Sequence, residues 1–335
     1  MPVEEKNDVA VSTGVQKLSG AVEKSGSTLA LLVRAKDKGF RVFARVFGLP
    51  GLKPTAGLTS RAGVIPVSPR QDTIGPICRT VSDAVYVLDA IVGFDPRDPE
   101  ATIEAAKFIP RGGYIQFLRD DGLKDKRLGV VRFPAPFNDS TVLSTFNNHL
   151  EVLRQGGATV LDNLQIPNID IIMDPNQSGE EIALLTEFKL SINQYLQELV
   201  KSPVRSLEDI ISFNDNNPDL EHMKQYGQDL FIASEMTNGL GKGEIKAVKL
   251  MEKLSEQGFE KTMREYELDA MVTVGWTVST ALAIGGYPAI TVPAGYGSNE
   301  MPFGICFGGL KGMEPKLIEI AYAFEQATSS RRPPF

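Results

Sequence analysis

Residues 268–307 read LDAMVTVGWTVSTALAIGGYPAITVPAGYGSNEMPFGICF and contain the clearest pattern for the fold. Three short apolar runs in this stretch have the length and the bounding turn residues of buried strands: 268–274, 289–292 and 303–307. Residues 278–284 are small and apolar and are followed by Gly285-Gly286, which predicts a short helix between the first two strands. Pro293 is expected to end the second strand, because proline cannot donate to a sheet ladder.

Strands also alternate with helices on the amino-terminal side of this stretch. The other expected elements are strands at 127–131 and 158–166 and helices at 80–92, 140–155, 180–200, 219–236, 244–267 and 314–326. Thr80 with Asp83 forms a capping-box pattern, and Ser140 is the expected N-cap of its helix. The alternation predicts an α/β layered fold.

The composition excludes several classes of protein. The chain has 335 residues, of which 42% are hydrophobic and 23% charged, so wholesale disorder is excluded. A net charge of −7 argues against a basic nucleic-acid binder. With two cysteines and two histidines, all far apart, neither a disulfide framework, a zinc site nor a histidine-based triad is expected, and no cofactor is implied.

The chain also contains no apolar run long enough to span a bilayer. Its first residues are polar and acidic, unlike a secretory signal, so a cytoplasmic location is the default expectation. Residues 1–28 are expected to be poorly ordered. Residues 29–49 are basic and apolar, which fits either an amphipathic helix at a membrane surface or a segment that packs on the body of the protein.

Three blocks of sequence carry a resemblance to a known family. They are GLKPT at 51–55 followed by GLTSR at 57–61, SPRQDTIGP at 68–76, and GYPA at 286–289 followed by VPAG at 292–295. In this order they resemble the amidase signature family, and SPRQDTIGP and FEQAT (324–328) resemble its plant and fungal branch. The resemblance covers about residues 51–333. It divides the chain into a divergent, partly disordered segment at 1–50 and a truncated amidase-like domain at 51–335.

The resemblance implies a fold, a reaction and a set of catalytic residues. The fold is an α/β/α sandwich around a mixed, twisted sheet, and the reaction is hydrolysis of carboxamide C–N bonds. A lysine base, a relay serine and a nucleophilic serine form the triad, because a serine hydroxyl needs a base to become a nucleophile. The family's nucleophile lies about twelve residues before the glycine that matches Gly51, which corresponds here to Gly39.

The rest of the triad is also missing from the expected positions. No glycine–serine run surrounds Val15, where the relay serine is expected, and Ser25-Gly26-Ser27 has the wrong spacing. The lysine would fall before Met1. We therefore expect no catalytic residue in this chain and no activity from the chain alone. We also expect the fold to lack the family's amino-terminal strands.

Four residues are candidates for a substrate pocket. Asp72 and Thr73 resemble loop positions near the substrate side of the family. For Asp72 the favoured interpretation is a turn or cap residue that binds local N–H groups. Trp276 and Ser279 follow a strand end, where ligands of α/β proteins often bind, although ordinary packing explains them as well. Lys53 and Ser60 lie in the first block and are expected to shape its loop.

Two functions of different classes therefore stay open. The chain is either a form of an amidase whose full length hydrolyses a small amide substrate, or a non-catalytic, amidase-like binding or scaffold protein. Lost strands leave an exposed sheet edge, which predicts self-association or a protein partner. No nucleic acid and no transmembrane segment are expected.

Overall fold

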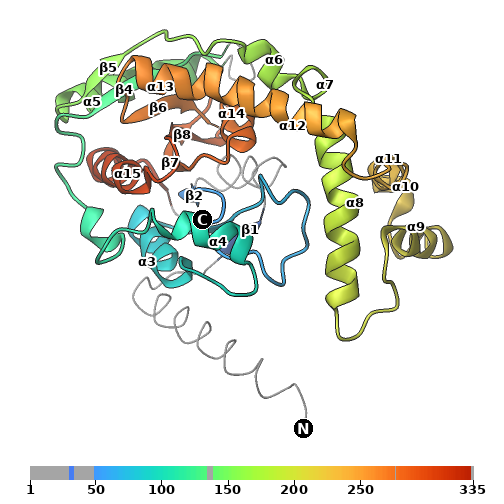
Figure 1. Ribbon diagram of the computed structural model, residues 1–335. Helices are drawn as coiled ribbons and strands as arrows, with labels where there is room; N and C mark the ends of the chain where they lie inside the picture. Colours follow the sequence, from blue (N-terminus) through green and yellow to red (C-terminus); the bar gives the residue numbers. More distant parts are fainter. Residues whose placement is uncertain (1–29, 34–48, 134–138, 276, 333–335) are drawn as a thin grey trace.

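The computed structural model describes residues 30–33, 49–133, 139–275 and 277–332. Within these residues the strands form one eight-stranded sheet in the order β1-β3-β2-β7-β8-β6-β4-β5 (Figure 1). Its strands are β1 (Ala30–Val33), β2 (Gly51–Lys53), β3 (Ile74–Ile77), β4 (Arg127–Val130), β5 (Thr159–Leu161), β6 (Ala270–Val274), β7 (Ala289–Tyr296) and β8 (Pro302–Gly308).

The sheet is mixed, as the resemblance implies. β4 pairs in parallel with both β5 and β6, whereas the other neighbouring pairs are antiparallel. The prediction that Pro293 ends its strand is wrong, because β7 continues to Tyr296. A shift in the ladder between Pro293 and Gly295 accommodates the missing N–H group, since proline is tolerated at a bulge.

Helices surround the sheet (Figure 1). They are α3 (Val81–Ile91), α4 (Pro99–Ala106), α5 (Ser140–Gln155), α6 (Ile169–Met173), α7 (Pro175–Ser178), α8 (Glu180–Glu198), α9 (Leu207–Asn216), α10 (Met223–Tyr226), α11 (Asp229–Glu235), α12 (Lys242–Ser255), α13 (Lys261–Glu265), α14 (Ser279–Ile284) and α15 (Glu314–Thr328). A π-helical turn at Glu256–Glu260 joins α12 to α13. No helix in the described ranges is long and apolar enough to cross a membrane.

Alternate side chains of the central strands enter two separate cores. In β6, Val272 joins the core built with α3, α5 and α15, whereas Met271 joins the core built with α6, α12 and α14. Phe307 and Cys306 of β8 divide in the same way. Because side chains alternate along a strand, both faces of the sheet are covered by helices. The predicted α/β class is confirmed.

The ends of several helices and strands differ from the predictions. The Thr80 side chain accepts a hydrogen bond from the Asp83 N–H, as predicted. Ser140, however, is the first helical residue, and the N-cap is Asp139, whose carboxylate accepts from the first free N–H groups of α5. The expected strand at 158–166 shortens to β5.

The region between α8 and α12 was predicted least well. The single helix expected at 219–236 is divided into α10 and α11, because Gly227 takes a left-handed φ of 59°. Helix α9 was not expected. We name α9, α10 and α11 the helical lobe; it extends from α8 to one side of the sheet (Figure 1). The expectations for 1–28 and for most of 29–49 lie outside the described residues.

Candidate functional site

The three sequence blocks meet at one end of the sheet, which we call the Lys53 end. Lys53, the last residue of β2, lies opposite Ala289 at the start of β7. The Ala56 N–H donates to the Gly286 carbonyl at 3.0 Å, which joins the first block to the third. The second block arrives at the same end because it leads into β3, the antiparallel neighbour of β2. Segments that are far apart in the sequence therefore build a single site.

Lys53 is a buried lysine that is bound to backbone carbonyls. Its Nζ donates to the Tyr287 carbonyl at 2.6 Å and to the Pro54 carbonyl at 3.3 Å. Burial lowers the pKa of Lys53 to about 7, because the charged ammonium loses its hydration. These contacts fit the expectation that Lys53 shapes its loop.

Glu314 is the second buried charge at the Lys53 end. Its Oε1 accepts from the Thr55 N–H at 2.6 Å, and the Thr55 hydroxyl accepts from the Gly312 N–H at 3.0 Å. Burial raises the pKa of Glu314, although its hydrogen bonds to Thr55 act in the opposite direction. The start of α15 is thereby fastened to the loop that follows β2.

Helix α8 docks on the second block through a carboxylate. The Ser68 hydroxyl donates to Glu187 Oε2 at 2.6 Å. Arg70 donates to the same carboxylate from Nε at 2.6 Å and from Nη2 at 3.1 Å. Sequence reasoning did not identify this role of Glu187. The available signal was the spacing of Glu180, Ala183 and Glu187, which places two acids on the buried face of α8.

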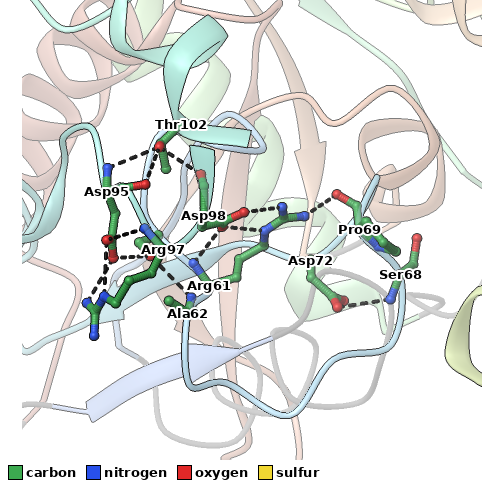
Figure 2. Close-up of polar contacts among 10 residues, drawn as sticks. Arg61, Ala62, Ser68, Pro69, Asp72, Asp95, Arg97, Asp98 and Thr102 are labelled. Atoms are coloured by element: carbon green, nitrogen blue, oxygen red, sulfur yellow. Dashed lines mark hydrogen bonds and ion pairs between the residues drawn. The ribbon is translucent and has the colours of Figure 1, made fainter. Parts of the chain in front are cut away.

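Asp72 is a turn residue in this structure. Its Oδ2 accepts from the Val67 N–H at 2.7 Å. The same oxygen accepts from the Ser68 N–H at 2.9 Å (Figure 2). These are the local contacts that the turn interpretation describes. Asp72 also lines a groove of about 330 Å³ between its own loop, the start of α4 and helix α8. The contact of Asp72 with a substrate stays a prediction.

Arg61 and Asp98 both line this groove and form an ion pair, which we call the arginine clasp (Figure 2). Arg61 donates from Nε to Asp98 Oδ2 at 2.9 Å and from Nη2 to Oδ1 at 2.8 Å, and Nη1 donates to the Pro69 carbonyl. The Ser60 hydroxyl donates to Asp95 Oδ2 at 2.7 Å. The clasp therefore fixes the first two blocks against the loop before α4 and holds the pKa of Asp98 below its usual value.

The four predicted pocket residues are not brought together. Thr73 is buried directly before β3, at the Lys53 end. Ser279 is buried at the start of α14. Because β6 and β7 are both antiparallel to β8, β6 begins at the Lys53 end, and Ser279 follows its other end. Trp276 lies outside the described residues. A substrate role for Thr73, Trp276 and Ser279 stays a prediction.

No lysine Nζ within 49–133, 139–275 and 277–332 is hydrogen-bonded to a serine hydroxyl. Ser60 and Ser68 instead donate to Asp95 and Glu187. In these ranges the two serines of the matched blocks are therefore bound to carboxylates, and neither is bound to a lysine.

Comparisons with known proteins agree with this fold and with the sequence blocks. A family model described as Amidase matches residues 41–318. A probable amidase of Arabidopsis thaliana is 58% identical over 284 residues, which cover 85% of this chain and 54% of that protein. A putative amidase of Schizosaccharomyces pombe is 30% identical over 362 residues, covering 98% of this chain and 61% of that protein.

The fold is also that of a solved amidase. The native peptide amidase from Stenotrophomonas maltophilia superimposes with a TM-score of 0.84 at 34% identity, over 92% of this chain and 63% of that one. The protein is thus of the α/β class that the amidases share. The chain belongs to the amidase signature family. It spans between half and two thirds of the length of these relatives.

Proposed function

We propose that this chain is part of an amidase that hydrolyses carboxamide C–N bonds, and that residues 1–335 alone do not catalyse the reaction. Family membership and the names of the relatives support the amide substrate. The proposed lack of catalysis rests on one observation. The position twelve residues before Gly51, where the family has its nucleophilic serine, is Gly39 in this chain.

The contacts of the matched blocks support the same conclusion. Acyl transfer needs a hydroxyl that can pass its proton to a base and that a substrate can reach. Ser68 is wholly buried, and its acceptor Glu187 is already bound to Arg70. The amine of Lys53 is directed at two carbonyl oxygens. Neither pair offers a nucleophile to an amide.

A labelling experiment tests this proposal directly. Purified chain 1–335 is treated with a fluorophosphonate probe, which modifies activated serines, and ammonia release from a simple carboxamide is measured in parallel. We expect neither labelling nor ammonia above a buffer blank. The Ser60→Ala and Ser68→Ala variants serve as matched controls. Labelling that either substitution removes would show that a block serine is the nucleophile and would overturn the proposal.

A non-catalytic binding or scaffold role is the second candidate, and the ends of the sheet favour it. β5 has three residues and pairs only with β4 in the described sheet, so it leaves an edge for another strand. Self-association through this edge would raise the mass of the particle with concentration, which light scattering measures. A constant monomer mass over a hundredfold dilution series would exclude it.

The domain division and the cytoplasmic location belong to the same proposal. We propose 1–50 as a segment distinct from the amidase domain at 51–335, although its residues 30–33 add the edge strand β1 beside β3. Limited proteolysis should cut before Gly51 and leave a stable fragment, and early cuts within 51–335 would contradict the division. A fluorescent fusion that is excluded from the cytoplasm would contradict the location.

A further inference from the structure

A cavity of about 580 Å³ lies beside the Lys53 end and has no role in the proposed reaction. One wall comes from α12, the π-helical turn and α13, and the other comes from the loops that carry Arg70, Gly285 and Lys311. Ile284, Leu310 and Phe108 supply apolar surface. Its volume lies in the range of small-molecule sites, about 300 to 1,000 Å³.

Hydrogen bonds hold the wall between α12 and Tyr287 in place. The Tyr287 hydroxyl accepts from the Ser255 hydroxyl at 3.0 Å and donates to Glu260 Oε2 at 2.9 Å. Arg264 binds the other oxygen of Glu260. The π-helical turn packs so closely that a Cβ on Gly258 would lie 2.9 Å from the Pro167 carbonyl oxygen. The cavity is therefore pre-formed on this side, and π-helical turns of this kind are frequent at functional sites.

Besides the ion pair of Glu260 with Arg264, charged groups of both signs line the cavity without pairing with one another. Within the described part of the chain, Glu252, Glu256 and Lys311 make no ion pair, and all three are exposed. Arg70 uses Nε and Nη2 on Glu187, which leaves Nη1 without a hydrogen bond to a described residue. Lys311 also acts on its surroundings, because its charge helps to lower the pKa of both Lys53 and Glu260.

We propose that this cavity binds a short zwitterionic peptide. Its ammonium group meets Glu252 and Glu256, and its carboxylate meets Lys311 and the free Nη1 of Arg70. An apolar side chain of the peptide packs on Ile284 and Leu310. A simple anion would face the two glutamates and a simple cation would face the two basic groups, so a ligand with both charges fits best. The inference goes beyond the proposed function, because it includes no covalent step.

Calorimetry with the dipeptide alanyl-leucine at pH 7 tests the inference on the whole chain. Saturable binding with a dissociation constant near 1 mM or below is expected, which corresponds to about −4 kcal/mol. N-acetyl-alanyl-leucine lacks the ammonium group and should bind at least fivefold more weakly. No saturation up to about 10 mM, or equal binding of both dipeptides, would overturn the inference.

Variants then locate the binding. Glu256→Gln and Lys311→Gln should each weaken binding about three- to tenfold, because each removes one charge partner of the ligand. Lys249→Gln, on an exposed position of α12 outside the cavity, is the matched control and should bind as the unaltered chain does. Unchanged binding in both cavity variants would place the ligand elsewhere. Mass spectrometry of the recovered dipeptide keeps this test separate from the proposed lack of catalysis.

Discussion

The Lys53 end of the sheet and the helical lobe differ in which side chains they bury. At the Lys53 end even charged groups are buried: Lys53 is 5% exposed and Glu314 is 1% exposed. In the lobe large apolar side chains remain outside, with Leu230 70% exposed and Met236 76% exposed. The Lys53 end therefore buries charged groups that would be better hydrated in water. The helical lobe leaves apolar side chains in water that would be more stable if buried.

The difference follows from the range of the contacts. The hydrogen bond from Thr55 to Glu314 joins residues 259 positions apart, so the Lys53 end exists only when the whole sheet has formed. The lobe instead packs on α8 around a small cluster that contains Leu196 and Leu207. Regions with few buried apolar contacts open locally at low free energy. We therefore expect the lobe to unfold without the sheet.

The largest expected effect comes from a deletion in the main core. Phe307 of β8 is fully buried, and its ring centroid lies 5.7 Å from that of Phe324 in α15. Phe307→Ala should lower the free energy of unfolding by about 3 to 5 kcal/mol, since it removes the ring and leaves a cavity. Urea denaturation followed by fluorescence or circular dichroism measures the loss. A loss below about 1 kcal/mol would show that this core is not close-packed.

A matched deletion in the lobe sharpens the comparison. Leu207 is fully buried in the cluster between α8 and α9. Leu207→Ala should increase amide exchange in α8 to α11, while exchange in β7 and β8 remains as in the unaltered chain, because the lobe opens separately. Hydrogen-exchange mass spectrometry resolves the two regions. Equal acceleration in β8 would show that the lobe and the sheet unfold as one unit.

The pH dependence of stability should reflect the buried charges near the sheet. The pKa of Glu325 is raised to about 7 by burial, so from its ordinary value to 7 the folded chain binds more protons and stability falls as pH rises. Lys53 has its pKa lowered to about 7, so above pH 7 the unfolded chain binds more protons and stability rises. The free energy of unfolding should therefore have a minimum near pH 7 and rise toward both lower and higher pH.

Two substitutions separate these contributions. Glu325→Gln should reduce the fall in stability between pH 5 and pH 7, and Lys53→Met should reduce the rise between pH 7 and pH 10, as measured by thermal or urea unfolding. Glu314, whose pKa is also raised, retains part of the fall in the Glu325 variant. A stability curve that keeps both slopes in the double variant would contradict the assignment.

The smallest effect is expected on the surface of the lobe. Leu230→Gln replaces a side chain that is already 70% exposed, so the free energy of unfolding should change by no more than about 0.5 kcal/mol. Urea denaturation measures this change. A loss above about 1.5 kcal/mol would mean that Leu230 has a buried partner.

Local signals in the sequence predict five of the eight strands of the described sheet, whereas β1, β2 and β3 have only three or four residues each and were not predicted. β6 and β8 are buried on both faces, so each is a largely apolar run, and glycines mark their ends. The hydrophobic pattern and the turn residues therefore predict the same strand bounds. The lobe lacks such agreement. Its segment around 213–219 is rich in Asn and Asp, and the turn at Gly227 interrupts a helical pattern that continues through it.

The site was predicted in part for the same reason. The blocks that meet at the Lys53 end were recognised, because each has a distinctive local pattern. The pairing of Arg70 with Glu187 and of Thr55 with Glu314 joins residues more than 100 positions apart, and no local pattern contains both members. Ser140 and Asp139 are both of residue types that favour the N-cap, and the backbone conformation shows that Asp139 occupies it.

The bond between Thr55 and Glu314 also sets a time scale for the synthesis of the chain. At about 5 to 20 residues per second, the ribosome needs roughly 15 to 50 seconds to extend the chain from one partner to the other. For most of this interval, until Tyr287 and β7 have been made, β2 lacks its neighbour and the amine of Lys53 has no Tyr287 carbonyl to bind. The first block therefore leaves the ribosome as an incomplete sheet edge, at the stage when a nascent chain is most exposed to wrong strand partners and most in need of a chaperone.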